Sequence, residues 1–212
     1  MRHPSQRWSH MAAETHALLP RSFFARDALE VARDLLGKLL RRDGVIVRIT
    51  EVEAYRHPND SANHCRFGLT ERNAAMWGPP GRAYVYLCYG VHNMLNLSTN
   101  EEGEGAAVLI RSAEPVLGLT EIQRRRGGMS GPGLLTGPGK VGQVLQLDTS
   151  WSHHPVTEPG GLEALDAPPV REILAGPRVG IDFAAPADRD APWRLAVAGT
   201  KWVSAPKGLR PV

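Results

Sequence analysis

The residues of this chain that can do chemistry gather in one stretch. All four tyrosines fall between Tyr55 and Tyr89, and Glu53, His64 and Asn96 lie in or beside that stretch. A chain that used tyrosine for general packing would scatter it. Electron-rich rings beside a carboxylate, an imidazole and an amide can stack on a planar ring, bind its edge and supply a base for proton transfer. This stretch therefore indicates the function better than the overall composition does.

A strand must position the carboxylates. Residues 45–55 (VIVRITEVEAY) are rich in Val, Ile and Thr, which predicts a β-strand. Strict alternation places six of them on one face: Val45, Val47, Ile49, Glu51, Glu53 and Tyr55. Since the first three are apolar and the last three are polar or aromatic, we expect the strand to run from the core into a cleft. Considered alone, however, an ExE sequence is more typical of a solvated strand end.

A hairpin must position the other tyrosines. Residues 83–87 and 94–98 predict two paired strands. Tyr84 and Tyr86 then share one face, with Tyr84 assigned to the core and Tyr86 to ring stacking. Tyr89 falls in the connecting turn, where burial does not explain a large ring.

Other elements flank these two. Residues 25–40 predict an amphipathic helix, although Gly37 weakens the prediction at its C-terminal end. The remaining predictions are a long loop over 57–80, a strand over 106–112, a helix over 120–126, a helix over 141–147 and short β-strands over 178–183 and 194–197.

Two segments offer positive charge to a phosphate. Arg124, Arg125 and Arg126 end a predicted helix, and stabilisation by the helix dipole explains such a run as well as phosphate binding does. The sequence TGPGK (136–140) precedes a predicted helix, so glycine backbone N–H groups and Lys140 together are typical of a phosphate cradle. The spacing is not that of a nucleotide P-loop, which favours a nucleic-acid backbone over ATP.

Composition bounds the protein class. The formal net charge is +3, and 21 of the 25 basic residues are arginine, which agrees with a polyanionic partner or with a GC-rich genome. Two cysteines are too few for a disulfide framework, and no metal-binding spacing occurs. We find no signal peptide and no apolar run of membrane-spanning length. These features predict a cytoplasmic, nucleoid-associated protein without a membrane segment.

The chain length and the glycine and proline content indicate the number of domains and the fold class. The chain has 212 residues, 22 glycines and 17 prolines, which favours one mixed or β-rich domain over a helical bundle. Residues 1–20 are predicted to be a flexible N-terminal leader, within which Met11 is an alternative start, and residues 21–212 a single domain.

Several motifs occur together in one order along the chain: EVEAY (51–55), His64, RN (72–73), GPPG (78–81), YVYLCYG (84–90), Asn96, Arg111 and TGPGK (136–140). Together they resemble the 3-methyladenine (alkylpurine) DNA glycosylases of the mammalian alkyladenine glycosylase type, from about Leu19 to nearly the C-terminus. The resemblance implies an α+β fold: a single domain with a curved, mostly antiparallel β-sheet, flanking helices and a protruding β-hairpin.

The resemblance also implies roles around the damaged base. Glu53 corresponds to the general base that activates water, and Arg111 to an arginine that helps hold the water and the flipped nucleotide. Tyr55 and Tyr86 correspond to the rings that stack on the extruded base, with His64 at its edge. A glutamate with an ordinary pKa near 4.3 is ionised at neutral pH and suits the base role.

Further residues are implied to contact the DNA. Tyr89 corresponds to the wedge that fills the gap left in the duplex, and Asn96 to the amide that checks the minor-groove edge of the purine. Gly137, Gly139 and Lys140 correspond to contacts with the DNA backbone.

The implied activity is that of a monofunctional DNA glycosylase in base excision repair. It would flip alkylated purines out of duplex DNA and hydrolyse the N-glycosidic bond, leaving an abasic site, as a monomer without metal or cofactor. Its range could extend to deaminated purines. Three local differences from the family pattern, at Arg56-His57, Phe67 and Val91-His92, bear on substrate breadth.

Two alternatives use the same residues differently. The tyrosines and arginines could stack single-stranded nucleic acid in a non-catalytic binding module. Glu51 and Glu53 could instead form the carboxylate pair of a small-substrate glycoside or nucleoside hydrolase. Such an enzyme has no use for an aromatic hairpin tip, so we rank it lower.

Overall fold

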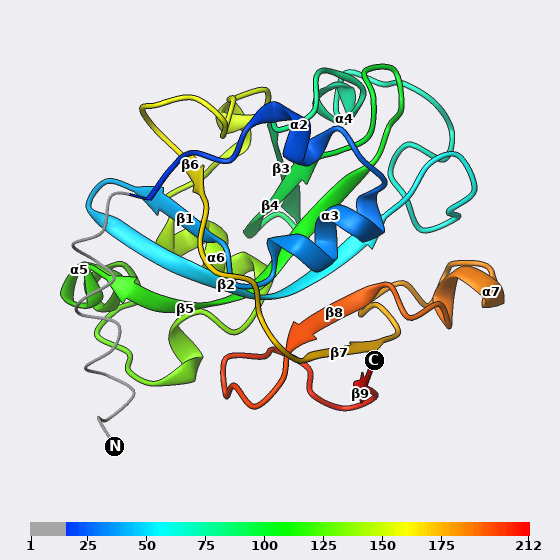
Figure 1. The fold of residues 1–212 in the computed structure, drawn as a ribbon. Coiled ribbons are helices and arrows are strands. Elements are labelled where there is room, and N and C mark those ends of the chain that lie inside the picture. The colour runs from blue at the N-terminus through cyan, green and yellow to red at the C-terminus, as the bar shows by residue number, and fades with distance from the viewer. Residues whose placement is uncertain (1–15) are drawn as a thin grey trace.

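A computed structural model describes residues 16–212, which fold around one long β-sheet (Figure 1). Within these residues the sheet has nine strands: β1 (Leu39–Arg42), β2 (Val45–Tyr55), β3 (Ala83–Cys88), β4 (His92–Ser98), β5 (Ala107–Leu117), β6 (Glu163–Leu165), β7 (Ile173–Gly176), β8 (Arg194–Val197) and β9 (Arg210–Pro211). The main path runs β3-β4-β5-β2-β8-β7-β9, β1 pairs with β2 and β6, and all these pairings are antiparallel.

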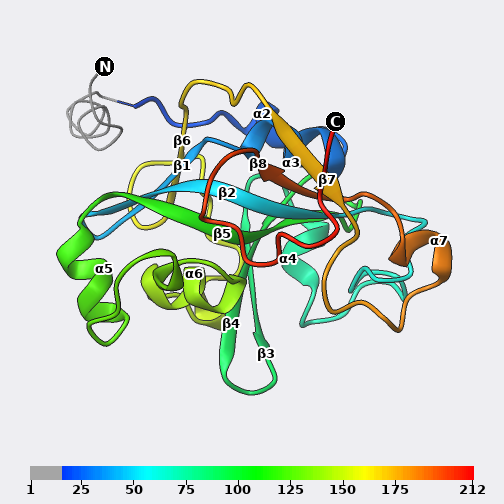
Figure 2. The ribbon, with the colours of Figure 1, turned by 90° about the horizontal axis from the view of Figure 1, so that it is seen from below.

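Short helices flank the sheet: α2 (Arg21–Phe24), α3 (Ala28–Leu35), α4 (Ala74–Trp77), α5 (Leu119–Arg125), α6 (Pro138–Val144) and α7 (Pro186–Arg189), with 3-10 turns η1 (Pro132–Leu134) and η2 (Thr149–Trp151). In Figure 2 the β3–β4 hairpin projects away from the sheet beyond the helices. The predicted α+β, mostly antiparallel, single-domain fold with a protruding hairpin is thereby confirmed.

The predicted helix over 25–40 is too long. It begins after Asp27, whose side chain caps the N–H of Leu29, and it ends at Leu35. Gly37 then adopts a left-handed conformation (φ +87°), where a β-carbon would lie 2.8 Å from Val170. This turn ends the helical run, and the following Leu39 joins β1 instead.

Most other predicted elements are present with shifted ends, and one is absent. Residues 178–183, predicted as a strand, form a loop after β7. Of the predicted leader, residues 1–15, Met11 among them, lie outside the described residues, whereas Leu18 forms a bridge to Leu165 and Leu19 is buried.

The predicted face assignment along β2 is wrong, because the strand is bulged. Thr50 is an extra residue on β2 between the pairs Ile49↔Ala113 and Glu51↔Ser112. An extra residue reverses the alternation of side chains beyond it. The main core accordingly contains the odd positions before the bulge (Val45, Val47, Ile49) and the even positions after it (Val52, Ala54). Glu51, Glu53 and Tyr55 therefore lie on the face opposite to the main core.

This reversal aligns one row of side chains across five strands. Directly opposite residues on neighbouring strands share a face. The register places Glu53 of β2 opposite Leu109 of β5 and Arg194 of β8. It continues from Leu109 to Asn96 of β4, and from Asn96 to Tyr84 of β3. The carboxylate, the amide and the phenol ring thus come from separate strands to one side of the sheet.

Candidate functional site

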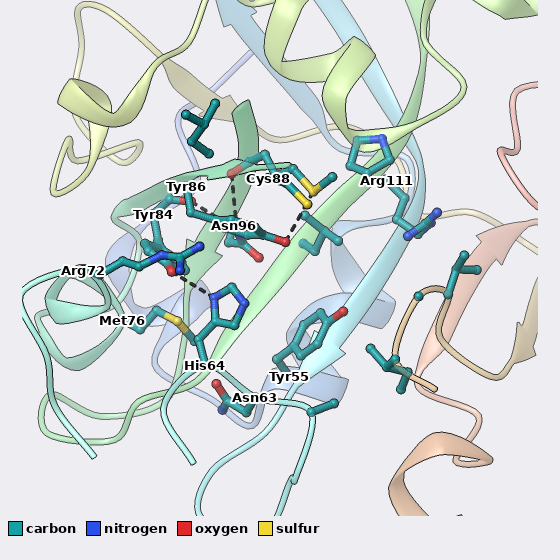
Figure 3. A pocket seen from close by; sticks show the side chains of 18 of the residues that line it. Tyr55, Asn63, His64, Arg72, Met76, Tyr84, Tyr86, Cys88, Asn96 and Arg111 are labelled. Atoms are coloured by element: carbon teal, nitrogen blue, oxygen red, sulfur yellow. Dashed lines mark hydrogen bonds between the residues drawn. The ribbon is translucent and has the colours of Figure 1, made fainter. Parts of the chain in front are cut away.

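A cavity of about 530 Å³ opens on this side of the sheet (Figure 3). Among the residues predicted for the site, Tyr55, His64, Tyr86, Tyr89, Asn96 and Arg111 all line it. Glu53 does not line the cavity, since its side chain is fully buried. It lies directly behind the wall, and its three hydrogen-bond or ion-pair partners, Tyr55, Arg111 and Val179, all face the cavity.

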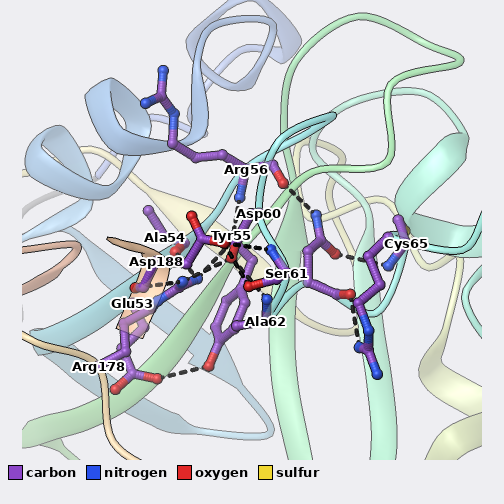
Figure 4. Close-up of polar contacts among 12 residues, drawn as sticks. Glu53, Ala54, Tyr55, Arg56, Asp60, Ser61, Ala62, Cys65, Arg178 and Asp188 are labelled. Atoms are coloured by element: carbon purple, nitrogen blue, oxygen red, sulfur yellow. Dashed lines mark hydrogen bonds and ion pairs between the residues drawn. The ribbon is translucent and has the colours of Figure 1, made fainter. Parts of the chain in front are cut away.

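The Glu53 carboxylate is held by three different kinds of donor. The Tyr55 hydroxyl donates to Oε2 at 3.0 Å (Figure 4). The backbone N–H of Val179 donates to Oε1 at 2.8 Å. Arg111 Nη1 lies 3.2 Å from Oε1. Such a set fixes the orientation of the carboxylate while it stabilises the ionised form.

Burial nevertheless raises the pKa of Glu53, against the expectation of an ordinary value. Loss of hydration outweighs the charge of Arg111 and the hydrogen bonds from Val179 and Tyr55, all of which lower the pKa. A carboxylate with a raised pKa is a stronger base than a free glutamate, provided that it is ionised at the working pH.

Arg111 reaches Glu53 because β5 is also bulged. Arg111 is the residue of β5 left without a partner on β2 between the pairs Glu51↔Ser112 and Val52↔Ile110. Its Nε donates to Ser204 Oγ at 3.2 Å, which holds the guanidinium in place. Bulges commonly redirect a side chain beside a functional site.

Glu51 has a different environment from Glu53, two residues away. It accepts from the Ser112 hydroxyl (2.8 Å), the Ser204 N–H (2.7 Å) and Arg194 Nη1 (3.0 Å). Burial opposes ionisation of Glu51, but the hydrogen bonds from Ser204 and Ser112 and the charge of Arg111 prevail and lower its pKa. Glu51 is fully buried like Glu53, but its hydrogen-bond partners Ser112, Ser204 and Arg194 do not line the cavity, so it is not placed as a second catalytic carboxylate of a glycosidase.

Three aromatic side chains form one wall of the cavity. Tyr84 and Tyr86 stack with ring centroids 5.6 Å apart, and the His64 ring meets the edge of Tyr86 at 4.6 Å. His64 Nδ1 and the Tyr84 hydroxyl form a 2.9 Å hydrogen bond. Tyr84 is thus a core residue, as predicted, and also the residue that orients His64, which the sequence analysis missed.

Burial and the charges of Arg72 and Arg66 lower the pKa of His64 to about 4. The imidazole is therefore neutral at physiological pH, with one nitrogen engaged by Tyr84 and the other available. The Asn96 amide nitrogen donates to the carbonyls of Tyr84 (3.2 Å) and Met94 (3.4 Å). Its side-chain oxygen is then the group left to meet a ligand.

Tyr89 occupies the tip of the β3–β4 hairpin. Its side chain is 89 % exposed, and its backbone has a positive φ of 51° followed by Gly90 at 71°. Two successive positive φ values are those of a type I′ turn, in which a tyrosine is unfavourable compared with Asn or Gly. The tip therefore holds a large ring in solvent at a cost in both hydration and backbone energy.

The GPGK segment is adjacent to the cavity. Gly137 precedes α6, Pro138 lines the cavity, and a β-carbon on Gly139 would lie 2.9 Å from the His92 ring. Small residues here let α6 pack closely on β4. Gly137, Gly139 and Lys140 do not themselves line the cavity.

The arginine run at the C-terminal end of α5 has a structural role. Arg124 and Arg125 both pair with Glu121 at 2.7 Å, and Arg125 also donates to the Val144 carbonyl. Arg126 donates to the Leu134 carbonyl and to Gln143. These contacts join α5 to α6, so of the two explanations the structure favours the local one.

A buried ion pair lies next to the site, and the sequence analysis missed it. Arg178 binds Asp60 through both terminal nitrogens, at 2.6 and 2.8 Å, and both side chains are fully buried (Figure 4). The same guanidinium lies 4.7 Å from the centre of the Tyr55 ring. Because Val179 follows directly, the pair also fixes the N–H that binds Glu53. The two partners are 118 residues apart, and no local signal marks either.

Residues 16–212 contain no group of three or more His, Cys, Asp or Glu side chains able to hold a metal ion. None of the helices in this range is long and apolar enough to cross a membrane.

Comparison with known proteins shows a close likeness. The methylpurine-DNA glycosylase family profile matches residues 22–201. A putative 3-methyladenine DNA glycosylase of Nitrosococcus oceani is 64 % identical over 194 residues, covering 92 % of this chain and 96 % of that protein. The DNA-3-methyladenine glycosylase of Arabidopsis thaliana is 60 % identical over 198 residues, covering 92 % and 78 % respectively.

Proposed function

The chain belongs to the methylpurine-DNA glycosylase family, and on that premise we propose how its own residues extrude, bind and release a damaged purine. As a member of this family it is a DNA glycosylase of base excision repair, a hydrolase of N-glycosyl bonds. The proposed substrate is duplex DNA that carries an alkylated purine, bound by a monomer. The proposed location is the cytoplasm, at the nucleoid.

Extrusion comes first, because the damaged base is out of reach inside a duplex. Flipping costs a few kcal/mol of lost stacking and pairing. Tyr89, exposed at the hairpin tip, is placed to enter the gap and replace part of the lost stacking. Gly137, Gly139 and Lys140, beside the hairpin at the start of α6, would contact the DNA backbone.

The extruded base would lie in the cavity between tyrosine rings. Alkylation at N3 or N7 gives a purine a positive charge, and the face of a tyrosine attracts a cation by about 0.5–2 kcal/mol. Tyr55 and Tyr86 are the rings proposed to stack on it, with neutral His64 at one edge and the Asn96 oxygen at another. A neutral histidine supports this assignment, since an imidazolium would repel the cationic base.

Hydrolysis would use Glu53 as the base. A water held near Glu53 and Arg111 attacks C1′ of the sugar, and the C1′–N9 bond breaks with its electron pair passing to the purine, which becomes neutral. Glu53 accepts the proton from the attacking water. The products are a free base and an abasic site. We propose a monofunctional enzyme, because none of the cavity-lining residues within 16–212 is a lysine that could form a covalent imine.

The observation that carries this proposal is the buried Glu53 carboxylate, ringed by three cavity-lining donors beneath a tyrosine-walled cavity. Its test is a duplex oligonucleotide with one alkylated or deaminated purine, incubated with the protein and then treated with alkali to cut abasic sites. We expect cleavage only after alkali. Strand scission before alkali would contradict the monofunctional assignment.

The variant Glu53→Gln tests the role of the carboxylate. General-base catalysis typically contributes a factor of about 100 to 10,000 to the rate. We therefore expect the rate of base release to fall at least about 100-fold while DNA binding persists. Glu121→Gln on α5 is the matched control, because neither that glutamate nor its partners Arg124 and Arg125 line the cavity. Full activity in Glu53→Gln would overturn the assignment. Absence of base release from the parent protein on every lesion would favour a non-catalytic binding module.

A further inference from the structure

Two phenylalanine rings beside the cavity are unusually exposed. Phe67, in the loop between β2 and α4, is 86 % exposed, and Phe183, in the loop after β7, is 65 % exposed. Soluble proteins rarely leave neighbouring large rings in water unless a ligand covers them. Phe183 also lines the cavity, so these rings adjoin the site rather than a remote surface.

Arg66 lies between the two rings. Its guanidinium carbon is 4.5 Å from the centre of the Phe67 ring and 5.5 Å from that of Phe183. Arg66 Nη1 donates to the Asn63 carbonyl at 3.1 Å. Among residues 16–212 no carboxylate forms an ion pair with Arg66, so its charge is not neutralised within the described protein. We call Arg66, Phe67 and Phe183 the mouth cluster.

The two loops that carry the mouth cluster are tied together. Asp188 accepts from the N–H of Ser61 at 2.9 Å and from its hydroxyl, and the Ala185 N–H donates to the same hydroxyl at 2.9 Å. The buried Arg178–Asp60 pair joins the same loops at a second point. The rings are thus presented by a cross-linked support, which reduces the entropy lost when a ligand binds.

We propose that the mouth cluster is a second DNA contact, separate from the hairpin tip, in which Phe67 and Phe183 stack on nucleotides adjoining the extruded one and Arg66 binds the intervening phosphate. This inference rests on the proposed function, since it assumes that a flipped nucleotide enters the cavity. Two π-faces flanking an uncompensated guanidinium match the alternation of bases and phosphates along a strand. Continuity with the cavity through Phe183 favours DNA over a protein partner.

The test is affinity for a duplex containing a stable abasic-site analogue, which needs no catalysis. Aromatic stacking on a base typically contributes enough that removing one ring weakens binding about 5- to 150-fold. We expect Phe67→Ala and Phe183→Ala each to fall in that range. Leu69→Ala is the matched control, because Leu69 is 65 % exposed in the same loop but outside the cluster, and its affinity should stay within about twofold of the parent's.

Salt dependence separates stacking from charge. Removing one phosphate contact lowers the slope of log K against log salt by about 1, which we expect for Arg66→Gln. The slope should be unchanged in Phe67→Ala and Phe183→Ala. Thermal melts of all four variants should match the parent, because the substituted residues are surface side chains.

A fluorescent base locates the contact. With 2-aminopurine placed next to the abasic analogue, stacking on Phe67 or Phe183 keeps its emission quenched in the parent complex, and the corresponding alanine variant restores emission. Parent-like affinity and quenching in both phenylalanine variants, with a parent-like salt slope in Arg66→Gln, would overturn the proposal and point to a protein partner for the cluster. Base release by the parent protein tests the proposed function separately, so either can fail without the other.

Discussion

The opening of the cavity and the layer beneath it both depart from the usual pattern of apolar residues inside and charged residues outside, but in opposite ways. Around the opening of the cavity, Tyr89 at the hairpin tip and Phe67 and Phe183 of the mouth cluster expose large rings to solvent. Beneath it, three carboxylates and three guanidinium groups are buried: Glu51, Glu53, Asp60, Arg111, Arg178 and Arg194. Neither arrangement is explained by stability, because exposed rings gain no burial energy and buried ion pairs seldom repay their desolvation.

This contrast indicates different roles for the buried charged layer and the exposed rings. The buried layer is charge-balanced and rigid, so the orientation of Glu53 is set before any ligand arrives. The rings of the mouth cluster and of the hairpin tip are uncovered, and we propose that they gain their contacts only when DNA supplies bases to stack on. Substitutions in the buried layer should therefore lower the stability of the protein, whereas substitutions at the exposed rings should weaken only its complex with DNA.

The largest effect on stability is expected in the lower layer. Asp60→Asn leaves the Arg178 guanidinium buried without a carboxylate, which typically costs about 3–5 kcal/mol. The free energy of unfolding from urea titration measures this loss. Asp190→Asn breaks an exposed aspartate–arginine pair in the same protein, and because solvent screens that pair the free energy of unfolding should stay close to the parent's. Equal losses in the two variants would show that the buried layer has no special importance.

A loss of catalysis without a loss of stability is expected at the hairpin tip. Tyr89→Ala removes the proposed wedge, and one lost stacking contact lowers the population of flipped complexes about 5- to 150-fold. Single-turnover base release from a well-paired duplex should slow accordingly. The defect should shrink when the damaged purine is opposite a mismatched base, since less pairing must be broken. A defect of the same size on both duplexes would argue against a wedge.

A smaller effect is expected in the pH dependence. The Tyr55 hydroxyl stabilises ionised Glu53, and removing it in Tyr55→Phe raises the Glu53 pKa above its already raised value. Because the base must be ionised, activity is lost as pH falls through that pKa, so the acid limb of the rate profile moves to higher pH. Tyr86→Phe is the control: its hydroxyl contacts Met94 Sδ at 3.3 Å and should leave the limb in place.

The smallest effect is expected away from both regions. Arg124→Ala removes one exposed partner of Glu121 and leaves Arg125 in contact with it. Because solvent screens exposed pairs of this kind, the free energy of unfolding should change little. The DNA affinity should also change little if the arginine run is structural. A large loss of DNA affinity, with stability unchanged, would restore the phosphate-binding explanation.

Much of the candidate site was predictable because its residues fall in short motifs. Tyr55, His64, Tyr86, Asn96 and Arg111 were predicted and all line one cavity. The partnership of Asp60 with Arg178 could not be predicted, since neither residue lies in a pattern and the loops meet only in three dimensions. The tie between Tyr84 and His64 was also missed, because a buried tyrosine in a strand is ordinarily a packing residue.

The chain's own composition and motifs determined the kind of chemistry: a carboxylate, stacking rings and an exposed aromatic tip, on an antiparallel sheet. Only the tertiary structure decided which side of the sheet they share. Thr50 and Arg111 are one-residue bulges in neighbouring strands, and each reverses the side-chain alternation that a linear pattern assumes. The pKa of Glu53 was likewise set by burial, which depends on the packing of β2, β5 and β8 around it rather than on its neighbours in sequence.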